Sequence, residues 1–526
     1  MTDYWKNRFI KSTKDVFDSD EEYVKEIFKI YESTIEDLDS EIFKLLNSME
    51  DVSMAEAKKL LNKYEIRSFK SGLDEFRKAS KGFISPDVEK ELDIVSRRVR
   101  ISRLQAMQVS MKSKVATLLN KEQKKLFAHL SNKFTSSYYK DLYELQRITG
   151  YKNINSLSKD FVNNILNTSW TSDGENFSDR IWKRKDKLLN TLDTELRQGL
   201  ITGKRPDEIT KAISDKLEVS KSNAKRLVLT ESSAIHSQSR KAMYERMGVE
   251  KYEVVATLDL RTSDICRKLD GKVFDVKDYE RGVTAPPYHV YCRSTTVPYY
   301  NDDIQAEIEN TRMARDPETG KSVRVENLSY KEWYNKYVKD NPEAIFIEKA
   351  WKNKNADKKQ FIKYRNVLGE DLKNNFKGFQ ETKYKDEDKY RLIKIDYKRR
   401  KKLIDNPNLL LPNVDKAYID KRKFTEYLFG GTNQDGLIKG SLINKKLGYN
   451  INNYKEFEEE ILIRARIYPT KLKTTGKYGS KYETRTIFYG KNEEPVNVEI
   501  GWLVNGDKTH LTSIYINEVN KSDFKD

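Results

Sequence analysis

The sequence predicts an α+β protein whose N-terminal half is mostly helical, with long antiparallel helices and a small sheet. A linker follows, and then a C-terminal α+β domain with an antiparallel sheet. Apolar residues recur at helical spacing near the N-terminus and alternate with polar residues near the C-terminus. The expected parts are a helical arm, a core with the small sheet, a charged helical linker and the C-terminal domain, at residues 1–150, 151–300, 301–389 and 390–526.

The helical arm is predicted from a heptad stripe that begins after Ser19. Its apolar positions alternate in steps of four and three, at Val24, Phe28, Tyr31, Ile35, Leu38, Ile42 and Leu45. Such a stripe is typical of a long amphipathic helix that packs against another helix. A second long apolar run after Pro86 can supply that partner, so we expect an extended antiparallel pair.

The chain stays helical from residue 155 to 248, with a turn at residues 203–206, and the next helix carries Thr230 and Glu231. A buried glutamate there needs a cationic partner. Arg261 suits this better than Arg226, which lies five positions earlier and off the helical face of Glu231. No nucleophile with an oriented base stands beside it, so we interpret Glu231, Arg226 and Asp259 as structural residues.

Two short strands, at residues 254–256 and 295–298, can pair and hold the loop between them. That loop contains both cysteines and one of the four histidines of the chain, as Cys266, His289 and Cys292. Two thiolates and an imidazole are typical ligands of a structural zinc ion, with Asp259, Asp270 or water as the fourth. Alternatively, the cysteines are small buried apolar residues and His289 bonds to the backbone.

The same loop resembles the signature of the phage Mu F-like (MuF) minor head proteins. The matching positions are Asp259, Arg261, Thr262, Cys266, Leu269 to Lys272, Pro286, Pro287, His289, Cys292 and Arg293. Upstream, Arg226, Thr230, Glu231, Ala234 and Gly248 resemble a helix of that family, and Tyr4, Trp5 and Arg8 resemble its opening. Many relatives place a further cysteine where this chain has Ser263, a departure that weakens the metal interpretation and leaves the fold expectation intact.

The resemblance implies a minor capsid protein that acts in head morphogenesis at or near the portal. Its partners would be phage portal and capsid proteins, and its location the virion, assembled in the host cytoplasm. Such a protein would touch or accompany the genome.

The charge balance favours a polyanionic partner such as DNA or RNA. Lysine and arginine outnumber aspartate and glutamate by 99 to 82, a net charge of +17, although acids are interleaved almost everywhere and a merely solvated surface is the alternative. Nonspecific nucleic-acid contacts are therefore predicted at the basic residues Arg261, Lys272, Arg293, Lys398, Arg399, Arg400 and Lys481.

Several classes of protein are excluded. Two cysteines in 526 residues make no disulfide framework, and no stretch approaches the roughly 20 apolar residues of a membrane helix. The N-terminus lacks the apolar core of a signal peptide, so we expect a soluble protein without a membrane partner. There is neither a Walker-type phosphate loop nor a Gly-rich dinucleotide turn, which excludes a packaging motor and a redox enzyme.

From residue 301 to 389 the sequence is polar and charged, with short apolar clusters typical of small helices on a linker. Beyond it, helices come first and the alternating strands 484–490, 496–505 and 509–519 follow. This layout resembles the small barnase/EndoU/colicin/RelE-like nuclease domains that are found fused behind MuF domains in phage proteins.

That second resemblance implies metal-independent RNA cleavage, in which a base activates the ribose 2′-hydroxyl and an acid protonates the leaving oxygen. The candidates are His510 as acid or base, Lys439 with Lys445 or Lys481 as phosphate clamps, and Thr512 and Tyr515 to position the substrate. A lone histidine on a strand is equally compatible with an ordinary edge residue. Two functions remain open: a virion component, or an effector nuclease whose MuF half is only the delivery adaptor.

Overall fold

The computed structural model describes residues 2–149, 156–299, 311–373 and 375–517, without the side chains of residues 2–7 and 147–149. The predicted Tyr4 and Trp5 match therefore lies outside the described side chains. The chain forms two compact units, Met1–Tyr337 and Val338–Asp526, and each has its own core. The boundaries predicted at residues 150, 300 and 389 stay predictions.

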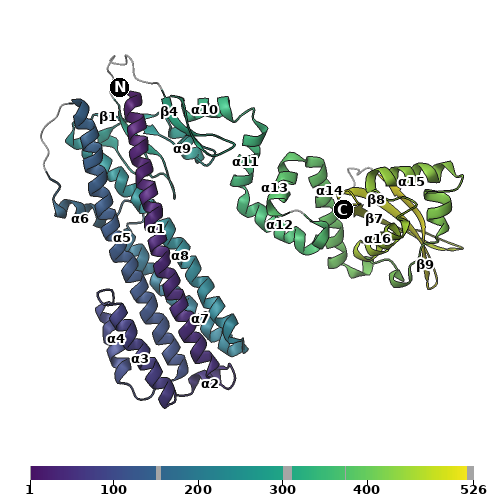
Figure 1. Ribbon diagram of the computed structural model, residues 1–526, viewed down its shortest axis with the longest axis horizontal. Coiled ribbons are helices and arrows are strands. Elements are labelled where there is room, and N and C mark those ends of the chain that lie inside the picture. Colours follow the sequence, from purple (N-terminus) through teal and green to yellow (C-terminus); the bar gives the residue numbers. More distant parts are fainter. Residues whose placement is uncertain (1, 150–155, 300–310, 374, 518–526) are drawn as a thin grey trace. The chain divides into compact units, whose positions relative to one another are not determined.

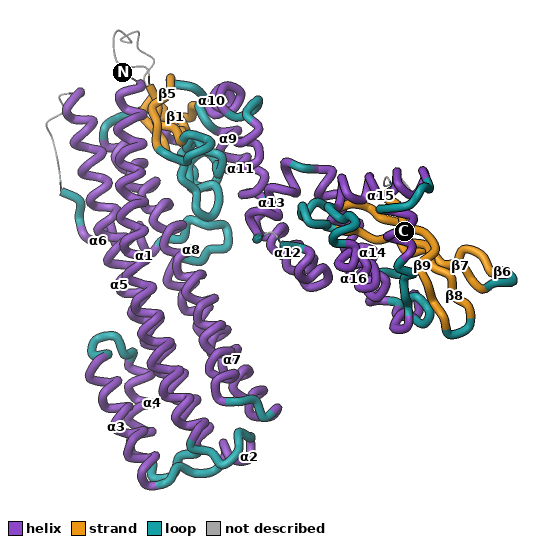
Figure 2. Tube along the Cα trace, turned by 45° about the vertical axis from the view of Figure 1, so that its right-hand side comes forward, coloured by secondary structure: helices purple, strands orange, loops and turns teal. Residues whose placement is uncertain are grey.

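Four long helices build the first unit (Figures 1 and 2). They are α1 (Thr2–Asn47), α5 (Arg103–Thr149), α7 (Phe177–Thr202) and α8 (Pro206–Arg246). Tyr31 on α1 bonds to Glu122 on α5, and Ser12 bonds to Asp141. Because the partner number rises on α5 as it falls on α1, the two helices are antiparallel, as the sequence predicts.

The apolar stripe of α1 packs where the heptad pattern places it. Tyr31, Leu38 and Ile42 are fully buried in the core of the bundle. Four shorter helices complete the helical part: α2 (Met54–Lys58), α3 (Lys63–Ala79), α4 (Pro86–Arg97) and α6 (Lys159–Asn167). No helix in the described ranges combines the length and the apolar character that a membrane crossing requires.

A three-stranded antiparallel sheet follows the bundle, in the order β2 (Val273–Asp275), β1 (Lys251–Val255), β3 (Thr295–Tyr299). Val255 is opposite Thr295, so the two strands predicted on either side of the loop do pair. The loop between them contains α9 (Asp264–Leu269) and the 3₁₀ turn η1 (Val276–Asp278).

A second hairpin, β4 (Thr311–Arg315) and β5 (Ser322–Glu326), and the helix α10 (Tyr330–Tyr337) belong to the first unit. The buried guanidinium of Arg312 pairs with Asp270 at 2.7 Å, and the backbone N–H of Arg315 donates to Leu258. The sequence suggested a linker in this region. No local pattern reveals that Arg312 pairs with Asp270, which lies 42 residues away.

The second unit begins with helices that pack on one another. They are α11 (Pro342–Lys352), α12 (Lys354–Leu368), the turn η2 (Gly369–Asp371), α13 (Phe376–Lys385) and α14 (Glu387–Asp405). Tyr364, Phe379 and Ile393 are buried in a common cluster. The apolar clusters read from the sequence as helices strung on a linker are thus part of a packed core.

The rest of the second unit is an α+β fold with one antiparallel sheet, in the order β6–β7–β8–β9. Its strands are β6 (Thr470–Gly476), β7 (Gly479–Phe488), β8 (Val496–Asn505) and β9 (Lys508–Ile516). The turns η3 (Pro407–Leu409) and η4 (Val414–Lys416), the π-helix η5 (Lys423–Leu428), α15 (Gln434–Leu447) and α16 (Tyr454–Ile467) precede them. Phe424, Phe457 and Trp502 are central to the core between helices and sheet.

Candidate functional site

Cys266, His289 and Cys292 meet beside the three-stranded sheet, as the sequence predicts for a metal site. The sulfur of Cys266 lies 3.3 Å from His289 Nε2 and 3.7 Å from the sulfur of Cys292. The three ligand atoms all lie within 4.8 Å of one another. Both cysteines are buried, and His289 is half-buried.

Local backbone geometry brings the three side chains together. Ser263 caps α9 by accepting from the N–H of Cys266, which fixes the first ligand at the start of that helix. Tyr291 adopts a left-handed conformation, with φ of 61°, and the N–H of Cys292 donates to the carbonyl of His289. His289 Nδ1 contacts the carbonyl of Val290 at 2.7 Å, so Nε2 faces the sulfurs.

The geometry and chemistry of this cluster fit a tetrahedral zinc ion. Zinc–sulfur bonds of about 2.3 Å separate two sulfurs by about 3.8 Å, close to the observed 3.7 Å. A disulfide would require about 2.05 Å. Hydrogen bonding to Cys266 lowers the pKa of the Cys292 thiol to about 6, whereas the same bond and burial raise the pKa of the Cys266 thiol, so Cys292 is the thiol that ionises first.

The two carboxylates predicted as further ligands are both engaged elsewhere. Asp259 pairs with Arg293 and accepts from Thr262, which lowers the pKa of its carboxyl group against the opposing effect of burial. Asp270 pairs with Arg312 and accepts from the backbone N–H groups of Ala256 and Tyr330. A fourth ligand would therefore be water or a group from outside this set.

Glu231 does not meet Arg261, the partner that the sequence suggested. Glu231 is buried and accepts a 2.8 Å hydrogen bond from Trp170 Nε1, not an ion pair from Arg261, which is exposed. Arg180 and Arg281 lie near enough to lower the pKa of its carboxyl group, but burial is the larger effect and raises it. Trp170 was missed because it lies 61 residues before Glu231.

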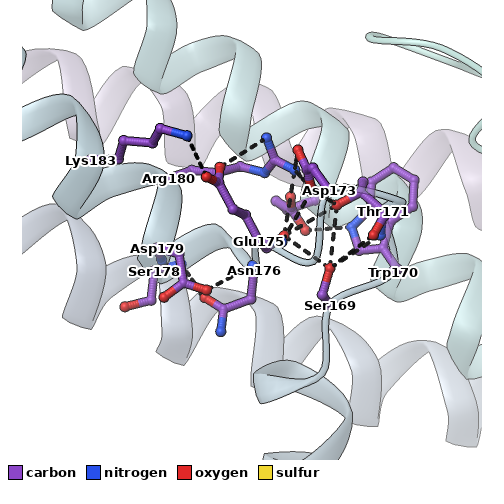
Figure 3. A network of polar contacts seen from close by, with 11 residues as sticks. Ser169, Trp170, Thr171, Asp173, Glu175, Asn176, Ser178, Asp179, Arg180 and Lys183 are labelled. Atoms are coloured by element: carbon purple, nitrogen blue, oxygen red, sulfur yellow. Dashed lines mark hydrogen bonds and ion pairs between the residues drawn. The ribbon is translucent and has the colours of Figure 1, made fainter.

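The loop that carries Trp170 is fixed by a polar network (Figure 3). Arg180 donates to both carboxylate oxygens of Asp173, and Asp173 also accepts from Thr171 and from the N–H of Glu175. Arg226 is exposed, and its carbonyl accepts from Thr230. The loop is thus positioned by its own side chains to present Trp170 to the long helix α8.

The basic residues predicted to contact nucleic acid fall into two groups. Arg261, Lys272, Lys398 and Lys481 are exposed. Arg293 pairs with Asp259, and Arg399 donates to Asn497 at 2.7 Å. Arg400 is buried, with ion pairs to Asp396 and Asp371, and would have to leave both carboxylates to reach a phosphate.

The candidate catalytic residues of the C-terminal unit gather on one face of its sheet. The helices α15 and α16 and the π-helix η5 cover the opposite, apolar face. Strand register places three rows of side chains across β7, β8 and β9 on the polar face. These rows are Lys481–Leu503–His510, Glu483–Gly501–Ser513 and Arg485–Glu499–Tyr515.

Gly501 stands at the centre of this three-by-three array, which therefore has no side chain in the middle. A bulge in β9 lies beside it, because Gly501 is opposite Ser513 while Trp502 is opposite Leu511. Thr512 is the extra residue of that bulge. A Cβ atom at Gly501 would lie 2.4 Å from Ser513 Oγ and 3.1 Å from Thr512 Oγ1, so a larger residue would require these hydroxyl groups to move.

Acidic groups that the sequence analysis missed lie beside the predicted Tyr515. Glu499 is buried, accepts from the Tyr515 hydroxyl and lies 3.5 Å from Arg485 Nε. Glu483, in the next row of the array, pairs with Arg485 at 3.0 Å and with Lys473 at 2.6 Å. Burial and the bond to Glu499 raise the pKa of Tyr515 to about 12.

Lys439 reaches the same region from α15. Its Nζ lies 6.0 Å from the ring centre of Tyr515. His510 lies against Tyr418, with ring centres 5.7 Å apart. The structure thus brings His510, Lys481 and Tyr515 onto one face, with Lys439 and Thr512 at its edge. Period-two counting along the predicted strands could have found Arg485 and Glu499, whereas Glu483 lies one residue before the predicted strand 484–490.

Comparison with known proteins identifies two regions. Residues 190–297 match the family described as Phage Mu protein F like protein, so a MuF-like domain spans α8, the Cys/His loop and β1 to β3. Residues 410–518 match a domain of unknown function, DUF6883. The first resemblance noted in the sequence is therefore confirmed for residues 190–297, whereas the likeness of the C-terminal part to nucleases stays a prediction.

One curated relative is NAD(+)–arginine ADP-ribosyltransferase EFV from Enterococcus faecalis. It is 25% identical over 271 residues, which cover 48% of this chain and 54% of the relative. The chain thus matches about half the length of that protein. No solved structure is significantly similar to the chain.

Proposed function

We propose that this protein is a minor head protein of a bacteriophage that acts at or near the portal during head morphogenesis. The observation that carries the proposal is the MuF-like domain at residues 190–297, which contains the Cys/His loop. The long antiparallel helices α1 and α5 suit an elongated contact with portal and capsid proteins. Exposed Arg261 and Lys272 on the same unit would give nonspecific contact with the packaged genome.

Protein composition of mature particles tests this proposal. Particles purified through a density gradient should retain the protein in few copies, detected by quantitative mass spectrometry. Particles assembled with a variant that lacks residues 190–297 provide the comparison, and we expect them to be malformed or unfilled. Intact particles without the protein would overturn the virion role.

We also place a structural zinc ion at Cys266, His289 and Cys292. The ion would hold α9 and the turn before β3 together, where the carboxylates of Asp259 and Asp270 are committed to arginines. Elemental analysis of the full chain should give one zinc per chain, lost in Cys292→Ser. An unchanged metal content in that variant would contradict this assignment.

A second function is supported by the array around Gly501, namely metal-independent cleavage of RNA by the C-terminal unit. His510 would act as acid or base, Lys439 and Lys481 would hold the phosphate, and Thr512 and Tyr515 would position the ribose. The relative named as a transferase supports the idea of an enzymatic effector joined to a head protein, delivered with the virion. Its own reaction is not assigned to this chain.

Incubation of the full chain with RNA tests the nuclease. Cleavage should continue in the presence of a chelator and disappear in His510→Ala, while the exposed Lys508→Ala on the same strand should keep the activity. Cleavage that needs a metal, or that persists in His510→Ala, would contradict the assigned role.

A further inference from the structure

Two lysines of the C-terminal unit lie close together at the edge of strand β9. Lys423 in η5 is half-buried, and its Nζ donates to the carbonyl of Thr512 at 2.7 Å. Lys439 in α15 donates to the hydroxyl of Tyr427 at 3.5 Å. The ring of Tyr427 lies near both, with its centre 4.4 Å from Lys423 Nζ and 5.9 Å from Lys439 Nζ.

Neither lysine has a carboxylate partner among the described residues. The neighbouring Arg422, in contrast, pairs with Asp420 at 2.6 Å. Burial, and then repulsion from Lys439, lower the pKa of Lys423, and a bound anion would oppose both effects. Two adjacent lysines without a carboxylate partner, one of them half-buried, indicate a site for an external anion.

Backbone packing holds the two lysines in place. Gly436 and Gly440 lie one turn apart on α15, on either side of Lys439. A Cβ atom would lie 2.2 Å from the Tyr427 carbonyl oxygen at Gly436 and 1.7 Å from that of Leu428 at Gly440. Only glycine allows the backbone of α15 to rest on the end of the π-helix, and this contact carries Lys439 against Tyr427 despite the repulsion from Lys423.

The surroundings of the lysines favour a phosphate over a carboxylate as the bound anion. Tyr427 and Tyr515 both offer ring faces near Lys439, and rings beside positive charges are typical of surfaces that bind single-stranded nucleic acid. The Tyr515 hydroxyl donates to Glu499, so an anion held by Lys439 would lie next to the array around Gly501.

We propose that Lys423 and Lys439, which both contact Tyr427, bind a phosphate group of a single-stranded RNA. The site rests on the proposed ribonuclease function and deepens it, because it places the RNA backbone at the β9 edge of the array. It adds Lys423 and Tyr427 to the residues that would contact the substrate.

Binding of a fluorescein-labelled 2′-O-methyl oligoribonucleotide to the full chain tests the site. This probe lacks the 2′-hydroxyl, so binding is measured without cleavage. Lys423→Met and Lys439→Met keep most of the packing and remove the charge. Each should weaken binding at low salt and reduce the slope of log affinity against log salt by about 0.7.

Lys446→Met is the matched control, because Lys446 lies exposed on the same helix α15. Its salt slope should stay close to that of the unchanged chain. Slopes in the two test variants that equal the slope of this control would overturn the proposal. Thermal unfolding of every variant shows whether a loss of binding reflects a loss of structure. If Lys439→Met unfolds at a lower temperature than the unchanged chain, Lys439→Arg provides the test of the site. The restored charge should then restore binding of the probe.

Two further outcomes separate this site from the proposed function. Lysine-dependent binding of the probe without cleavage of ordinary RNA would keep the phosphate site and reject the ribonuclease. Cleavage that continues in both lysine variants with an unchanged KM would keep the ribonuclease and reject the site. A polyglutamate competitor that displaces the probe as well as unlabelled RNA does would identify an acidic protein as the partner and overturn the nucleic-acid assignment.

Discussion

Individual buried charges in this protein are stabilised by specific partners far along the chain. The ion pair between Arg312 and Asp270 is almost completely buried, with side-chain exposures of 3% and 1%. Asp270 accepts two backbone N–H groups as well, and Arg312 donates to the carbonyls of Ala256 and Leu328. This pair joins the β4–β5 hairpin to the loop that contains the Cys/His cluster.

Removal of one partner of this pair should destabilise the first unit strongly. In Arg312→Met the carboxylate of Asp270 stays buried without its counter-charge, which costs about 3–5 kcal/mol. Chemical denaturation of the full chain measures the loss. The double variant Asp270→Asn with Arg312→Met should recover part of it, and a double variant as unstable as the single one would show that the charge is not the cause.

Glu231 should make the stability of the first unit depend on pH. Because burial raises the pKa of its carboxyl group above the unfolded value, the folded state holds the proton more tightly. This contribution to stability is fully present below the unfolded pKa and is lost as pH rises through the folded value. Glu231→Gln keeps an acceptor for Trp170 and should raise the unfolding midpoint at neutral pH, with a gain that shrinks as pH falls toward 4.5. A gain that does not change with pH would contradict this account.

Residue types were easier to predict from the sequence than residue partners. Cys266, His289 and Cys292 could be grouped because cysteine is rare in this chain and the ligand spacing is informative. The partner of Glu231 could not be predicted, since Trp170 comes from a separate loop. The same reason explains Arg400, which reads as part of a basic run but pairs with Asp371, 29 residues away.

The packing around two helices shows how differently glycine is used, depending on whether there is room for a Cβ atom. Gly440 on α15 touches the backbone of η5, whereas Gly72 on α3 is exposed and has no neighbour within 4 Å of a Cβ atom. The same residue type thus has opposite roles in the two helices. At Gly72 it only adds backbone freedom to the unfolded chain.

Alanine at these two positions should change stability in opposite directions. Gly440→Ala forces α15 away from η5 and should destabilise the second unit by about 1–3 kcal/mol, whereas Gly72→Ala should stabilise the first unit by about 1 kcal/mol. Calorimetry of the full chain measures both shifts. A Gly440→Ala protein as stable as the unchanged chain would show that the contact with η5 is not tight.

Element type was predictable where a period is strong and unbroken. The heptad stripe gave α1, and the alternating residues gave β7, β8 and β9. The edge strand β6 was not predicted, because residues 471–476 are all exposed and show no alternation. The sequence also predicted a short helix over residues 421–430, but no period in it distinguishes the π-helix η5 from an ordinary α-helix.

At the scale of the whole molecule, the two compact units carry different chemistry. The first has the MuF-like domain and a Cys/His group of the metal-binding type, whereas the second has a sheet face that carries carboxylates, basic residues and a tyrosine. The sequence predicted the Cys/His group and the antiparallel sheet in outline. It could not show how the array around Gly501 is assembled, because strand register and the bulge at Thr512 decide which side chains share a face.

Metal removal should therefore affect the two units unequally. A chelator added to the full chain should lower the unfolding midpoint of the first unit, because a bound ion stabilises only the folded arrangement of Cys266, His289 and Cys292. The second unit contains no cysteine and its transition should not move. Calorimetry of the full chain with and without chelator resolves the two transitions. In Cys292→Ser the chelator should have no further effect, whereas the exposed Arg261→Ala in the same unit should respond like the unchanged chain. A chelator effect that persists in Cys292→Ser, or that moves the second transition, would place the metal elsewhere.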